Sequence, residues 1–99
     1  MKYELRSTKQ YRKWLSGIKD KLTLARVLNR IDRMTAGSFG DYKAISSNLF
    51  ELRMFFGSGY RIYFTIKERE IIFLLVGGDK STQNKDITKA KELLEQLEE

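Results

Sequence analysis

The sequence contains no cysteine, no histidine and no proline. Without cysteine there is no disulfide and no thiol nucleophile, and without histidine there is no serine-type triad, HExxH zinc site or zinc finger. Metal binding would have to rest on carboxylates alone, and we expect neither a metal nor a cofactor. Any general base must then be a carboxylate, a tyrosine, or a lysine or arginine with a perturbed pKa.

Long apolar segments are also lacking. The longest apolar run, residues 71–76, is far shorter than the roughly 20 residues that span a bilayer. The opening MKYELRSTKQ has no apolar core of the kind found in a signal peptide. We therefore expect a cytoplasmic protein with no membrane contact. A chain of 99 residues has enough surface for one hydrophobic core, so residues 1–99 are expected to form a single domain.

Basic residues outnumber acidic ones, with 19 Lys and Arg against 13 Asp and Glu and a formal net charge of +6. The apolar fraction of 41% lies in the range of chains that fold rather than remain disordered. The positive charge makes a polyanion such as nucleic acid the first partner to consider.

The hydrophobic periodicity predicts two helices, then strands, then a final helix. The first helix is expected to begin after Ser7 or Thr8, and the second after Asp20, because these side chains are good N-caps. Ser81 or Thr82 is the expected N-cap of the last helix, whose apolar residues could cover the second face of a sheet.

The strands are indicated by period-two alternation. Residues 49–56 and 60–66 alternate and are joined by a Gly-Ser-Gly turn, which predicts a hairpin. Residues 71–76 are apolar on both faces, as in a covered central strand that the next two glycines end. The short alternating segment Lys2–Leu5 predicts an edge strand. The result is an α+β chain of order β-α-α-β-β-β-α.

Alternation places Arg53, Arg61 and Tyr63 together on the face of the hairpin that the core does not use. Several of these side chains are close enough to address one ligand. The alternative is a solvated basic face in which the arginines pair with Glu51 or Glu70.

Lys80 follows the central strand near the start of the last helix, where free N–H groups favour an anion such as phosphate. Lys43 lies in a glycine-containing loop and is a second candidate for phosphate binding. The stretch GGDKS lacks the P-loop spacing, which excludes nucleotide hydrolysis of that kind. Trp14 lies on the apolar side of the first helix and is expected in the core.

Three segments carry a resemblance to a known family, and together they cover almost the whole chain. They are YRKWLSGIKDKLTLARVLNRIDRMTAGSFGDYKAI, FELRMFFGSGYRIYF and LLVGGDKSTQNKDITKAKEL. In this order and spacing they resemble the RelE/ParE superfamily of bacterial toxins, and specifically its HigB-like addiction-module killer branch.

This resemblance implies a fold with two N-terminal helices on one face of a curved antiparallel sheet, a C-terminal helix, and the active site on the other face. It implies a toxin that cleaves translated mRNA on the ribosome by attack of a ribose 2′-OH on the adjacent phosphate. The implied partner is a helix-turn-helix antitoxin of the HigA type. The candidate catalytic residues are Arg53, Arg61, Lys80 and Asp86, and the candidate RNA-binding residues are Lys43, Tyr63 and Lys85.

The chain departs from RelE at the expected base and acid. RelE has lysines on the strand where this chain has Glu51, and a tyrosine near the C-terminus where this chain has Asp86. With no histidine present, Asp86 or Glu51 is the candidate base, and Tyr63 or Lys80 the candidate acid.

Two other functions are compatible with the same fold. One is a ParE-like inhibitor of DNA gyrase with no nuclease activity, and the other is a nucleic-acid-binding domain without catalysis. The Arg-rich face and Lys80 favour RNA as the target.

Overall fold

A computed structural model describes residues 2–98 and has the expected α+β class. The first half of the chain forms β1 (Glu4–Ser7), α1 (Lys9–Ser16), α2 (Lys21–Thr35) and β2 (Tyr42–Ser46). The second half forms β3 (Leu49–Arg53), β4 (Arg61–Lys67), β5 (Ile71–Gly78), the short 3-10 helix η1 (Lys80–Thr82) and α3 (Gln83–Glu98). None of the helices in this part of the chain has the length and apolarity that a bilayer crossing requires.

The sheet has five strands in the order β1-β5-β4-β3-β2, one more than the sequence predicts. The extra strand, β2, occupies the segment expected to be a loop. It is mostly exposed and contains a bulge between Ala44 and Ser46, so it lacks a clear alternation. The sheet is mixed and not purely antiparallel, because β1 pairs with β5 in parallel. The first strand also lies two residues later than expected.

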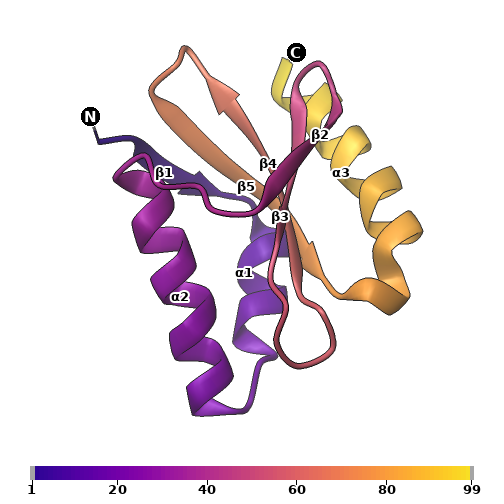
Figure 1. Cartoon of the computed structure of the whole chain (residues 1–99). Coiled ribbons are helices and arrows are strands. Elements are labelled where there is room, and N and C mark those ends of the chain that lie inside the picture. The colour runs from indigo at the N-terminus through magenta and orange to yellow at the C-terminus, as the bar shows by residue number, and fades with distance from the viewer. Residues whose placement is uncertain (1, 99) are drawn as a thin grey trace.

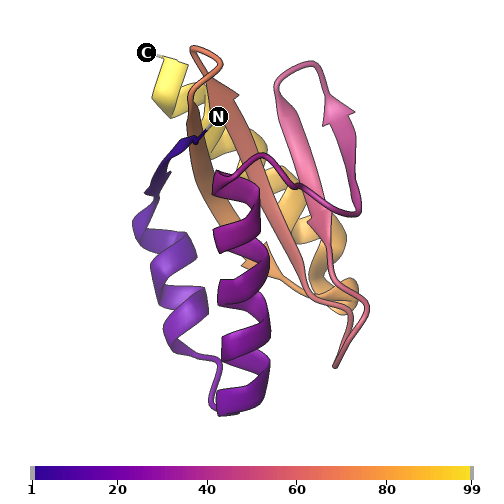
Figure 2. The same cartoon turned by 60° about the vertical axis from the view of Figure 1, so that its left-hand side comes forward.

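Helices cover both faces of the sheet. Figure 1 and Figure 2 show α1 and α2 side by side on one face and α3 on the other. The alternation of the hairpin is confirmed, since Leu52, Met54, Ile62 and Phe64 join the core beneath α1 and α2. A second apolar cluster lies beneath α3 and contains Leu49, Tyr63, Leu75, Ala90 and Leu93. The final helix therefore covers the second face, as expected.

Side-chain caps start the helices. Thr8 accepts a hydrogen bond from the backbone N–H of Tyr11 at 3.0 Å, and Asp20 accepts one from Thr23 at the same distance. Both caps agree with the sequence. The last helix differs, because Asp79 caps η1, which leads directly into α3.

Gly77 and Gly78 do not end the central strand as expected, since β5 continues through both. They are needed because other side chains approach their backbone closely. A Cβ on Gly77 would lie 2.1 Å from the Trp14 ring, and one on Gly78 would lie 1.8 Å from the carboxylate of Asp86. The glycines therefore seat α1 on one side of β5 and the start of α3 on the other.

Candidate functional site

The candidate site is built on three neighbouring strands. Arg53 of β3 pairs with Arg61 of β4, and Glu51 pairs with Tyr63 on the same two strands. On the other side of β3, Lys43 of β2 is the partner of Glu51. This register gathers three cationic side chains around one carboxylate, at the face of the sheet that also carries α3.

Glu51 is the centre of the site and has no exposed surface. Its Oε2 accepts hydrogen bonds from the Tyr63 hydroxyl and from the Gln83 side chain, each at 2.9 Å. Burying a carboxylate costs several kcal/mol unless opposite charge and hydrogen bonds compensate. Glu51 is therefore an anchor for the groups around it.

The three cations lie close to Glu51 without hydrogen-bonding to it. Lys43 Nζ and Arg53 Nε are each 3.9 Å from Oε1, and Arg61 Nε is 3.7 Å from Oε2. Oε1 and both Nε atoms are buried without a hydrogen-bond partner within the described residues. The pairing with Glu51 agrees with the alternative prediction for this face, but Arg61 is buried and not solvated. Three cations against one carboxylate nevertheless leave an excess of positive charge and unused donors.

Burial also differs among three of the predicted residues. Tyr63 is fully buried, which argues against the direct RNA contact expected of it. Burial and the hydrogen bond to Glu51 raise the pKa of Tyr63 above its ordinary value. Arg61 is 8% exposed, and its Nη1 donates to the backbone oxygen of Gly59 at 2.9 Å. Arg53 is more open, with a third of its side chain exposed.

Asp86 borders this cluster from the first turns of α3. Thr82 donates a hydrogen bond to its carboxylate, which lies against the backbone of Gly78. Burial raises the pKa of Asp86 above its usual range, although the Thr82 hydrogen bond acts in the opposite direction. A carboxyl group with these properties is suited to take up a proton.

The predicted lysines have different positions. Lys80 is exposed in η1 and lies beside Gly59, as Arg61 Nη1 does, so it borders the cluster. Lys85 is exposed on α3 and, within residues 2–98, makes no ion pair or side-chain hydrogen bond. The structure thus brings Lys43, Arg53, Arg61 and Tyr63 together around Glu51, with Lys80 and Asp86 at the edge and Lys85 outside.

Two side chains that support the cluster around Glu51 have no clear signal in the sequence. Gln83 belongs to α3 and reaches Glu51 only because that helix packs on the sheet. Arg30 belongs to α2, and the helical periodicity of that segment gives no sign of a contact with the sheet. Its guanidinium nevertheless donates to the backbone oxygens of Arg53 and Phe39, at 2.9 Å and 3.1 Å, and so holds the end of β3 against α2.

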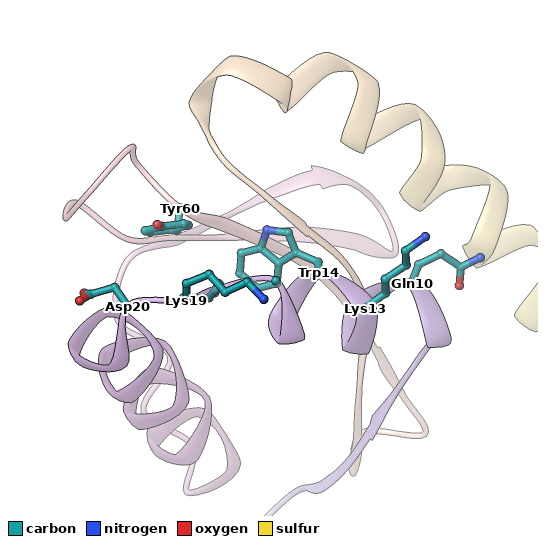
Figure 3. Close-up of a pocket in the computed structure, with 8 residues that line it drawn as sticks. Gln10, Lys13, Trp14, Lys19, Asp20 and Tyr60 are labelled. Carbon is teal, nitrogen blue, oxygen red and sulfur yellow. The ribbon is translucent and has the colours of Figure 1, made fainter.

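A separate groove of about 600 Å³ lies away from these charges, between α1 and the β3–β4 hairpin. Its apolar residues include Trp14, Ile18 and Tyr60, and Lys13 and Lys19 line it as well (Figure 3). Trp14 is thus only half-buried, although it packs against the core as expected. The groove contains no cluster of catalytic groups.

Solved structures share this fold. A mutant of the Escherichia coli toxin RelE in the free state aligns with a TM-score of 0.74, covering 93% of this chain and 97% of that one at 14% identity. The RelBE toxin–antitoxin complex of Mycobacterium tuberculosis gives 0.65, covering 81% of this chain and all of the matched one at 20% identity. The protein therefore has a RelE-like α+β fold.

Sequence relatives then identify the family. Residues 13–95 match the family described as Phage derived protein Gp49-like (DUF891), and the chain belongs to it. A protein from Haemophilus influenzae is 41% identical over 97 residues, which cover 98% of both chains.

Proposed function

We propose that this protein is the toxin of a type II toxin–antitoxin system, similar to HigB, and that it cleaves mRNA on the ribosome. The observation that carries the proposal is the excess of cationic groups around the buried Glu51 on a RelE-like fold. Guanidinium groups bind phosphate through several donors at once, and donors held rigidly in a partly dry site stabilise developing charge more strongly than donors in water.

In the proposed reaction, a ribose 2′-oxygen attacks the adjacent phosphorus and the bond from phosphorus to the 5′-oxygen breaks. Asp86 takes the proton of the 2′-OH, and Lys80 gives a proton to the departing 5′-oxygen. Arg61 and Arg53 stabilise the charge on the phosphate. The products are a 2′,3′-cyclic phosphate and a 5′-hydroxyl end.

Exposure and bonding favour this assignment over the other candidates. Glu51 is fully buried, and two donors already occupy its Oε2, so it serves better as an anchor than as a base. Tyr63 is fully buried and its hydroxyl is bound to Glu51, whereas Lys80 is exposed. Lys43 and Lys85 are exposed cations suited to contact neighbouring phosphates of the RNA.

Primer extension on a translated message, with and without ribosomes, tests the proposal. We expect discrete cuts within translated regions only when ribosomes are present, and none with a folded Arg61→Ala variant. Cuts without ribosomes would make the protein a free ribonuclease. If there are no cuts at all, the nuclease proposal is wrong.

A ParE-like gyrase inhibitor is the second candidate, because the fold alone does not determine the target. It predicts no mRNA cuts and a loss of DNA supercoiling by gyrase when the protein is added. The nuclease is favoured by the position of Asp86 against Gly78, the strand partner of Arg61, and by the position of Lys80 beside Gly59.

We also propose an antitoxin partner of the helix-turn-helix type. Two structures with this fold are toxin–antitoxin complexes, one from Mycobacterium tuberculosis and one the intact RelBE complex of Escherichia coli, whose TM-score is 0.52 at 14% identity over 78% of this chain. Such a partner silences the site by covering the Arg53 and Arg61 face or by preventing access to the ribosome through its bulk.

A further inference from the structure

Phe55 is an exposed aromatic side chain directly beside the cationic cluster. It follows β3 by two residues, and 77% of its surface is exposed, more than for any other large apolar residue among residues 2–98. Alternation along β3 places it on the face of Glu51 and Arg53, and the Arg53 guanidinium lies 5.6 Å from the ring centroid. Single exposed apolar residues are common, so the significance of Phe55 rests on this neighbour.

The loop that carries Phe55 is held on the core side. Met54, with 1% exposure, donates its backbone N–H to the Tyr60 oxygen at 2.9 Å. Phe56 packs against Tyr60 with 5.8 Å between ring centroids, and Gly59 donates to the Phe56 oxygen at 3.2 Å. The backbone on both sides of Phe55 is therefore held to the hairpin, which restricts the region of the surface that its ring can occupy.

We propose that Phe55 is a stacking platform for an unpaired base of single-stranded RNA, whose adjoining phosphate lies against Arg53 and Arg61. This inference rests on the proposed function and adds a subsite for the base. Proteins that bind single strands combine cations along the backbone with aromatic rings on which bases stack. Arg53 serves both parts, because its guanidinium contacts the Phe55 ring and belongs to the cluster around Glu51.

A stacking subsite at Phe55 predicts that the protein distinguishes single-stranded from duplex RNA more strongly than it distinguishes one base from another. Every base has a π face, so stacking on a phenyl ring discriminates weakly between bases. A base within a duplex is already stacked and paired, and it cannot place its face on Phe55 without leaving the helix. Single-stranded RNA is therefore expected to bind more tightly than the same sequence in a duplex.

Binding of a short single-stranded RNA that carries one 2-aminopurine tests the platform without ribosomes or cleavage. The fluorescent base is moved along the oligonucleotide, and a second set carries an abasic nucleotide at each position. We expect quenching at one position with the parent protein. Phe55→Ala should abolish this quenching and weaken binding about tenfold, within the range measured for loss of one stacked base. Phe55→Trp should retain both.

Two comparisons keep the outcomes distinct. Leu22→Ala removes another exposed apolar side chain, on α2, and should leave binding and quenching unchanged. On RNA that is abasic at the quenched position, Phe55→Ala should bind as the parent does, whereas Arg61→Ala should remain weaker than the parent.

Parental binding and quenching by Phe55→Ala, with loss of binding by Arg61→Ala, would overturn the platform and leave the phosphate site in place. Parental binding by both variants would contradict the proposed function as well. If Phe55→Ala binds and quenches RNA like the parent but no longer arrests growth, the ring contacts a protein and the platform is wrong.

Discussion

Arg61 combines an anchored guanidinium with an unused donor. Its Nη1 is held by the Gly59 oxygen, and its Nε lies 3.7 Å from Glu51 without a hydrogen bond. An ammonium cannot reproduce this planar fork. We expect Arg61→Lys to lose roughly 2 to 4 kcal/mol of transition-state stabilisation, as for one preorganised donor, measured as the rate of mRNA cleavage on ribosomes.

Lys80→Ala should lose a similar amount of transition-state stabilisation. If the side chains of Lys80 and Arg61 contact one phosphate, the variant with both substitutions should lose less than the two single variants lose together. Thermal unfolding provides the control for each variant. A folded Arg61→Ala protein that still arrests growth like the parent would show that this face is not the site. An unfolded variant would instead give Arg61 a structural role beside Glu51.

Asp86 offers a test by pH. As a base it acts in its ionised form, so activity should fall as pH decreases through its pKa. The Thr82 hydrogen bond lowers that pKa against the effect of burial. Thr82→Val removes the bond, raises the pKa further and should move the acidic limb of the pH–rate profile to higher pH.

Thr82→Ser keeps a hydroxyl group and should keep the parental profile. Thr88→Val changes a threonine of α3 whose hydroxyl bonds to the Asn84 backbone, and it should have no effect on the profile. If Glu51 were the base, the profile of Thr82→Val would match that of the parent, because Thr82 bonds to Asp86 and not to Glu51.

Residue types and alternation were sufficient to predict that Arg53 and Arg61 share a face. They did not reveal which members of that face are buried. Glu51 and Tyr63 lose all their exposed surface, and Gln83 reaches Glu51 from a distant helix. These contacts depend on how α3 packs on the sheet, and local sequence periodicity does not predict that packing.

At the scale of elements, the packing of α1 on β5 depends on the absence of a side chain at Gly77. A Cβ there would lie 2.1 Å from the Trp14 ring, so Gly77→Ala must displace the ring or the helix. We expect this substitution to reduce the free energy of unfolding by about 1–3 kcal/mol, as for other overpacked sites, measured by urea denaturation.

The double-mutant cycle with Trp14→Leu is the control for this contact. The smaller leucine leaves room for the new methyl group. The double variant should therefore lose less unfolding free energy than the two single variants lose together. Strict additivity would mean that Gly77 is required for its backbone and not for the close approach of Trp14.

The elements also show where local patterns are weak. The caps of α1 and α2, the hairpin and the apolar central strand were predicted because each has a strong local signal, whereas Asp79 and not Ser81 or Thr82 caps the turn that leads into α3. The edge strand β2 was not, because an exposed strand with a bulge shows little alternation. The parallel pairing of β1 with β5 joins strands more than sixty residues apart. The alternation within each segment predicts a strand but not the direction in which two distant strands pair.

For the molecule as a whole, the distribution of positive charge decides where the proposed antitoxin could bind. The net charge is +6, and the cluster around Glu51 concentrates three cations on one face. Lys13 and Lys19 line the groove between α1 and the hairpin instead. An acidic partner segment that covers the site must pair with the cations around Glu51 and not with Lys13 and Lys19.

We therefore expect Arg53→Ala combined with Arg61→Ala to weaken antitoxin binding at least about tenfold, since each lost charge-assisted hydrogen bond contributes about 1.5–3 kcal/mol. Titration calorimetry at low and high salt measures the loss, which should shrink as salt screens the exposed part of the interaction. The matched control is Lys13→Ala combined with Lys19→Ala, which also removes two positive charges and should bind like the parent. The reverse result, parental affinity without the arginines, would exclude direct covering of the site, so the partner would have to block the ribosome by its bulk.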